Sequence, residues 1–303
     1  MNAQPAPRSS PVRAILWMVA ATMMAAVTGG AVRQMGGEYS TFELVFLRGL
    51  VATAMMAPTM IWRARQDSLR PRRMKLYLAR SSLSYIGTVC LFFALANMPV
   101  ADTYALMFTV PMFTILLAVL LLKEGAGARA WIVCAVGFAG AMVIVRPGFA
   151  TVSLAALAAL ATAACYASAN ICIRKLTATE SPERITAFNS LLMLLMATPL
   201  AVVYWVTPSL EHWPWILAIG ISNTLGALCH TRALGQAEAR VVQPFSFLRL
   251  VWSVGVGWML FSELPEVWTW VGAAIIFGSS YYMLLAERAR RRTPPPEDGA
   301  TPR

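Results

Sequence analysis

Long apolar blocks alternate with short polar or basic segments along almost the whole chain. Each block is about 20 residues long, which is the length an α-helix needs to cross about 30 Å of hydrocarbon. The blocks do not alternate apolar and polar residues, as membrane-spanning strands do. The pattern therefore predicts ten membrane-spanning helices, at about 11–32, 41–62, 76–97, 101–122, 128–145, 152–173, 185–206, 213–234, 241–261 and 267–286.

The two ends of the chain are polar. The leader 1–10 and the Pro-rich tail after residue 292 are too poor in apolar residues to fold alone, so both are expected to be disordered. Arg13 and the apolar run after it have an alternative interpretation as a secretory signal peptide. The length of that run and its place in a sequence repeat favour a first membrane span.

The chain contains an internal duplication. The stretch 94–131 falls on 233–270 without a gap when it is moved along the chain by one constant shift. Chemically distinctive residues coincide at this shift: Cys90 with Cys229, Phe108 with Phe247, Glu124 with Glu263 and Trp131 with Trp270. We therefore predict two repeats of five helices, at 11–148 and 152–287, with the leader 1–10 before them and a basic tail at 288–303.

Basic residues set the expected orientation. Alternate loops carry most of them, including the segment 63–75 and the cluster at 288–292. Short cytoplasmic loops are rich in Lys and Arg, so both termini are expected in the cytoplasm. With five spans each, the two repeats then cross the membrane in opposite directions. Inverted repeats are typical of secondary transporters with a site near the midplane.

Composition excludes several function classes. Hydrophobic residues make up 58% of the chain and charged residues only 13%, with a mean hydropathy of +0.62. A soluble domain needs more polar surface than this. The net charge of +11 is explained by cytoplasmic loops and does not indicate nucleic acid. The sequence has no metal-ligand spacing, phosphate-binding loop or nucleophile motif, so we expect no catalytic residue, metal or cofactor.

Several short motifs resemble those of EamA-type members of the drug/metabolite transporter superfamily. The first group lies before and within the fourth predicted span: Ala94-Leu95, Pro99, Ala101-Asp102 and Pro111-x-Phe113. Two motifs end the fourth and fifth spans: Leu122-Lys123-Glu124 and Val145-Arg146-Pro147-Gly148. Two more lie around the start of the tenth span: Ser262-Glu263-Leu264-Pro265 and Trp268-Thr269-Trp270. The resemblance covers about 14–286. The second repeat departs from the pattern, because Val241 stands where the first repeat has Asp102.

This resemblance implies a secondary active transporter in a bacterial inner membrane, with a small metabolite and the lipid bilayer as its partners. Substrates of such proteins include amino acids, vitamins, nucleoside-like compounds and metallophores. We expect export of a carboxylate-bearing, amino-acid-derived compound, such as an amino acid or an opine-like metallophore. Uptake of a vitamin or nucleoside-like metabolite, of the riboflavin or S-adenosylmethionine type, is the alternative. A non-transporting scaffold or intramembrane enzyme is the alternative of another class, and a homodimer is left open.

Two arginines inside predicted spans are the strongest site candidates. A charge at the membrane centre costs about 2.5–3.5 kcal/mol on insertion scales. Arg48 and Arg249 must therefore have a functional or structural role that offsets this cost. Gln243, Ser246 and Arg249 share one polar face of the ninth predicted span. With no acidic residue near midspan, an anionic substrate would offset the positive charge. The structural alternative is an arginine bonded to neighbouring carbonyls.

The remaining candidates come from the helices that line the cavity in the family the chain resembles. They complete the predicted substrate site: Trp17, Ser84, Tyr85, Tyr104, Tyr166, Asn170 and Asn223. Simple packing is the alternative for each of them. His230 is the candidate coupling residue because its unperturbed pKa lies near neutrality; the alternative is a neutral histidine bonded between helices. The fifth and tenth spans have small residues spaced for close packing, at Ala135/Ala139 and Ala274/Gly278.

Overall fold

The computed structural model describes residues 11–64, 73–110, 112–114, 116–117, 128–145, 153–177, 182–236 and 243–292. These parts of the chain form helices and contain no strand. The helices are α1 (Pro11–Met35), α2 (Thr41–Ala64), α3 (Met74–Asn97), α4 (Val100–Met107), α6 (Ala128–Val145), α7 (Leu154–Thr177), α8 (Pro182–Val203), α9 (Trp213–Gln236), α11 (Leu248–Phe261) and α12 (Val267–Arg292), with short 3-10 segments η1 (Leu210–His212) and η2 (Gln243–Phe247). The predicted disordered ends, 1–10 and 293–303, lie outside the described residues.

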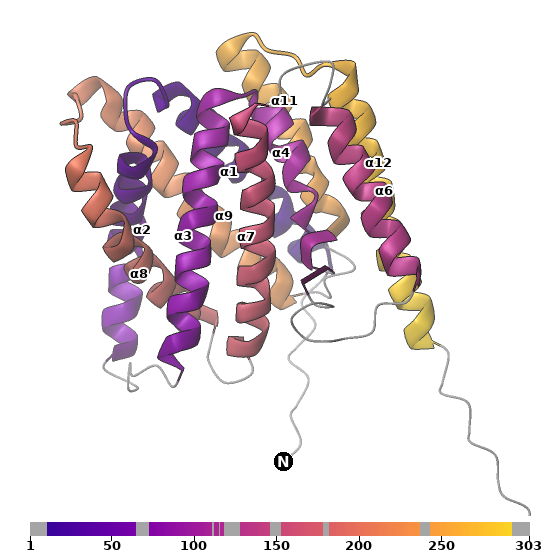
Figure 1. The fold of residues 1–303 in the computed structure, drawn as a ribbon. Helices are drawn as coiled ribbons and strands as arrows, with labels where there is room; N and C mark the ends of the chain where they lie inside the picture. The colour runs from indigo at the N-terminus through magenta and orange to yellow at the C-terminus, as the bar shows by residue number, and fades with distance from the viewer. Residues whose placement is uncertain are drawn as a thin grey trace, which may run out of the picture.

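The helices run side by side as one bundle (Figure 1). Their exposed side chains match a membrane rather than water. Five of the helices contain segments long and apolar enough to cross a bilayer: Val12–Met35, Thr41–Pro58, Met74–Asn97, Leu154–Ile173 and Arg184–Val203. Large apolar side chains point outward, among them Leu195, Val203 and Met259, which are 58%, 72% and 79% exposed. Apolar exposure on this scale indicates contact with lipid.

Helices of the first repeat pack mainly against helices of the second. The closest partners are α1 with α9, α3 with α7, α2 with α8 and α6 with α12. In predicted order these are spans 1 with 8, 3 with 6, 2 with 7 and 5 with 10. If each helix is replaced by its counterpart in the other repeat, the pair 1–8 becomes the pair 6–3. The pairs 2–7 and 5–10 become themselves. The packing therefore agrees with the predicted all-α fold of two five-helix repeats.

The fourth and ninth predicted spans are not continuous α-helices. α4 ends at Met107, and a turn follows at Phe108 and Thr109. Pro111 explains the break, because it has no N–H and disfavours helical geometry in the residue before it. In the second repeat the described chain starts with the 3-10 segment η2, which gives way to α11 at Leu248. The described parts of the predicted spans 101–122 and 241–261 are thus helical with one irregular point each, and residues 111, 115, 118–122 and 241–242 lie outside the described residues.

Both irregular points lie at equivalent positions of the repeats. Phe108 follows α4, and its counterpart Phe247 precedes α11. Their rings are 4.6 Å apart between centroids. Equivalent residues of the two repeats thus contact each other, as expected close to the axis that relates the repeats.

The small residues that the sequence spaces for close packing on the fifth and tenth spans are not at the contact between α6 and α12. Ala135, Ala139 and Ala274 are exposed, and a Cβ added to Gly278 would have no neighbour within 4 Å. The helices instead meet at Gly140 and Gly272, and they lie together at one edge of the bundle (Figure 1). The two helices therefore pack closely through small residues, but these are Gly140 and Gly272 and not the predicted pairs.

We expect Gly272→Ala to destabilise the protein and Gly278→Ala to leave it unchanged or slightly more stable. A Cβ at position 272 would lie 2.6 Å from the backbone oxygen of Gly140, which cannot rotate away. Overpacking of this kind costs about 1–3 kcal/mol, whereas replacing an unhindered helical glycine gains about 0.4–1 kcal/mol. Thermal unfolding in detergent measures both. Equal melting temperatures for the two variants would contradict the assigned contact.

Candidate substrate site

Arg48 lies inside the bundle and binds the opposite repeat. Its Nε donates a hydrogen bond of 2.9 Å to Oδ1 of Asn223, which joins α2 to α9. The bond uses one of the five N–H donors of a guanidinium. Two residues predicted independently for the site are therefore brought together by the fold.

Arg249 lies over an aromatic ring. Its guanidinium carbon is 5.5 Å from the centroid of Tyr104, a cation–π contact between α11 and α4. The hydroxyl of Tyr104 donates a 2.6 Å hydrogen bond to the carbonyl of Ala25 on α1. Tyr104 thus connects the arginine to the first helix.

Tyr166 links the two arginines. Its hydroxyl is 3.1 Å from that of Thr88, and it interacts electrostatically with both Arg48 and Arg249. Gly87 on α3 makes the close approach possible, since a Cβ there would lie 2.8 Å from the ring. The site therefore has two guanidinium groups flanked by the phenol rings of Tyr104 and Tyr166.

Several buried donors on these helices have no hydrogen-bond partner within the described part of the chain. Three of them are Nε of Arg249, Nε1 of Trp252 and the hydroxyl of Tyr85; others are the hydroxyl of Thr53 and Nε of Arg80. A buried donor without a partner costs about 1–3 kcal/mol, and more when it is charged. Such groups require an explanation, and a bound water, ion or ligand is one. Trp252 was not among the predicted site residues, because a tryptophan in an apolar span looks like packing.

The other predicted residues are less tightly connected to this centre. His230 on α9 interacts electrostatically with Arg249. Trp17 lies elsewhere, under the guanidinium of Arg232 at a distance of 5.1 Å from the ring centroid. The other placements are a partly buried Ser246, an exposed Asn170 and a Ser84 whose carbonyl accepts from Thr88. The side chain of Gln243 lies outside the described residues.

The acidic residues Glu43 on α2 and Asp102 on α4 form hydrogen bonds near the ends of their helices. Glu43 is fully buried in the first turn of α2 and accepts a hydrogen bond of 3.3 Å from the backbone N–H of Val206. Asp102 in the first turn of α4 accepts one of 2.7 Å from the hydroxyl of Thr269. Neither contact reaches Arg48 or Arg249. These two hydrogen bonds of the carboxylates therefore lie away from the two arginines.

Comparison with known proteins agrees with this architecture. The family model of the EamA-like transporters matches twice, at residues 12–146 and 153–285. The chain belongs to the EamA-like transporter family. One solved crystal structure matches with a TM-score of 0.64 and 18% identity, covering 94% of this chain and 100% of the other, which shows the shared fold.

Curated relatives of this EamA-family protein are transporters. A pseudopaline exporter of Pseudomonas aeruginosa is 29% identical over 264 residues, which cover 86% of this chain and 92% of the relative. A riboflavin transporter of Vibrio cholerae is 30% identical, over 88% of this chain and 91% of the relative. An S-adenosylmethionine uptake transporter of Rickettsia prowazekii is 24% identical, over 86% and 89%. The protein is therefore an integral membrane transporter of small metabolites and not an enzyme.

Proposed function

We propose that this transporter binds a negatively charged small metabolite between Arg48 and Arg249 and moves it by alternating access. The observation that supports this most is the buried Nε of Arg249, which has no partner in the described part of the chain. Arg48 already donates to Asn223, so Arg249 offers the freer guanidinium. A carboxylate or phosphate binds both prongs of such a group.

The phenol rings restrict the substrate class further. Tyr104 and Tyr166 flank the arginines, and their rings suit a substrate that also has an apolar or planar part. A carboxylate-bearing, amino-acid-derived compound fits these contacts best. We propose export, as for the pseudopaline exporter. Uptake of a vitamin or nucleoside-like compound, as for the riboflavin and S-adenosylmethionine transporters, is the second candidate.

Counterflow in proteoliposomes tests this function. Vesicles that contain the purified protein are loaded with an unlabelled candidate, and entry of the labelled compound is followed. Amino-acid-derived carboxylates should exchange, whereas the matching amides, which lack the negative charge, should not. Metabolite profiles of cells lacking and overproducing the protein supply the candidates. Exchange of the amides at the rate of the acids would contradict an anionic substrate.

The orientation of the protein in the bacterial inner membrane is a further part of this proposal. The described ends of α2 and α3 flank the basic segment 63–75, and α12 ends in Arg290, Arg291 and Arg292. Basic segments of this kind remain in the cytoplasm. We propose that both termini and the 63–75 loop face the cytoplasm.

Cysteine labelling tests the orientation. A cysteine placed at Ser68 in a cysteine-free variant should react with an impermeant maleimide in inside-out vesicles and not in intact cells. A cysteine placed at Glu211, in the exposed segment before α9, is the matched control and should show the opposite behaviour. Labelling of position 68 from outside intact cells would overturn the assigned orientation.

A further inference from the structure

Arg33, in the last turn of α1, binds three segments of the chain at once. Its Nη1 donates a 2.6 Å hydrogen bond to the carbonyl of Met98, between α3 and α4. Its Nη2 forms an ion pair with Oε1 of Glu263, between α11 and α12. Its guanidinium also lies over the ring of Phe261, 5.2 Å from the centroid. We call Arg33, Glu263 and the Met98 carbonyl the Arg33 latch.

The latch lies where helices from both repeats meet. We call this the α1–α2 end of the bundle, because α1 ends and α2 begins there. Two glycines on α1 and one just after it make the contact possible. A Cβ at Gly29 would lie 2.8 Å from the ring of Tyr104, and Cβ atoms at Gly30 and Gly36 would overlap Val256 and Ala96. Helix α1 therefore packs tightly against α3, α4 and α11 around Arg33.

The turn that carries Glu263 has an unusual backbone. Ser262 has a φ of 54°, the left-handed conformation that favours glycine. The N–H of Glu263 binds the carbonyl of Gly257, which folds the chain back over the end of α11. A strained residue at this position costs about 1 kcal/mol or more and persists because its surroundings require it. Here the strained turn brings the Glu263 carboxylate to Arg33.

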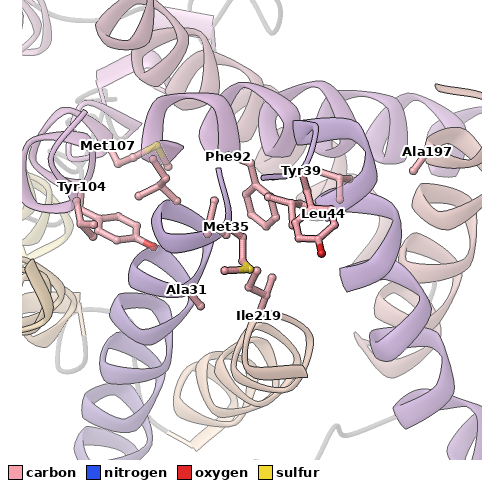
Figure 2. Close-up of a cluster of buried hydrophobic side chains, with 13 residues drawn as sticks. Ala31, Met35, Tyr39, Leu44, Phe92, Tyr104, Met107, Ala197 and Ile219 are labelled. Atoms are coloured by element: carbon pink, nitrogen blue, oxygen red, sulfur yellow. The ribbon is translucent and has the colours of Figure 1, made fainter. Parts of the chain in front are cut away.

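An apolar cluster lies at the same end of the bundle. Its members come from both repeats and include Met35, Leu44, Phe92, Tyr104 and Ile219, all of them buried. Figure 2 shows these side chains gathered between the helices, with Tyr104 and Met107 at one edge. The cluster and the latch together place buried apolar side chains and an ion pair between the two repeats at this end.

Tyr104 connects the cluster to the substrate site. The ring of Tyr104 belongs to the cluster and also contacts Arg249, and its hydroxyl binds Ala25 on α1. Ala25 and Arg33 are separated by about 12 Å along one rigid helix. A substrate that displaces Tyr104 from Arg249 would therefore loosen α1 at its bonded end.

We infer that the Arg33 latch holds the α1–α2 end of the transport pathway shut and must open once in each transport cycle. The ion pair joins α1 of the first repeat to the α11–α12 turn of the second, so alternating access cannot open this end while it remains. The inference rests on the proposed transport through the Arg249 site. In the proposed orientation, the closed end faces away from the cytoplasm.

Accessibility without substrate is the first test. Tyr85→Cys is made in a protein free of its five native cysteines, and an impermeant maleimide is applied from the α1–α2 side. Adding Arg33→Gln should raise the labelling rate at least fivefold. The charge exchange Arg33→Glu with Glu263→Arg should return the rate to its starting value. Arg13→Gln, an exposed arginine at the opposite end of α1, is the matched control.

Cross-linking is the second test. Arg33→Cys and Glu263→Cys are joined by a bifunctional methanethiosulfonate reagent, and transport is measured before and after reduction. Cross-linking the two cysteines should lower transport at least tenfold, and reduction should restore it. The reagent should not change transport by either single-cysteine variant. Unchanged labelling in Arg33→Gln, or full transport by the joined protein, would overturn the latch. The labelling test needs no substrate. Its result therefore tests the latch even if Arg249 does not bind the substrate.

Discussion

Arg249→Gln should reduce transport by about 30-fold to several thousand-fold while the protein still inserts and folds. Removing one partner of a buried, hydrogen-bonded charge pair costs about 2–5 kcal/mol, and 1.4 kcal/mol corresponds to a factor of ten. The substrate would lose its main anchor. Folding should be spared, because Nε of Arg249 has no partner in the described part of the protein. Uptake into vesicles and thermal stability in detergent give the two readouts.

Two further variants make this result specific. Arg249→Lys should recover little transport, because an ammonium cannot form the planar two-pronged contact of a guanidinium. Arg13→Gln removes a charge from an exposed position on α1 and should transport normally. If Arg249 is only structural, Arg249→Gln should lower the melting temperature instead. Normal transport by a normally folded Arg249→Gln protein would move the search to Arg48 and Arg232.

The helix ends were predictable wherever an apolar run stops at polar or helix-breaking residues. The predicted bounds of the fifth span, 128–145, are those of α6, and those of the second span differ from α2 by two residues at one end. The breaks after α4 and before α11 were not predicted. Hydropathy reports burial in lipid and is blind to a local change of backbone geometry inside one apolar run.

The candidate site was predictable in its charges and not in its contacts. Arg48 and Arg249 stand out because a charge in a span is costly. Their partners, Asn223 and Tyr104, lie far away in sequence and are fixed only by how the repeats pack. The same limit applies to Arg33. Arg33 directly follows the first predicted span, and only the fold brings Glu263 to it.

Asn223→Leu should destabilise the protein by about 2–3 kcal/mol and should abolish most transport. Arg48 would keep its buried charge and lose the hydrogen bond that the Asn223 amide oxygen now accepts. Hydrogen bonds to charged groups contribute about 1.5–3 kcal/mol, and an unsatisfied buried donor adds a penalty. Leucine has the branching and the heavy-atom number of asparagine, but its two methyl groups take up more space than the amide, so the measured loss includes some crowding. Thermal unfolding in detergent measures the loss.

The double variant Arg48→Met with Asn223→Leu separates the structural role of this pair from its role in binding. Replacing both partners by apolar groups of similar size is often neutral for stability, so the double variant should melt close to the wild type. Transport should stay low, because Arg48 would no longer contribute a positive charge to the site. If the double variant transports normally, Arg48 is a structural arginine and Arg249 alone binds the anion. A double variant as unstable as Asn223→Leu would show instead that the asparagine stabilises the bundle through contacts other than Arg48.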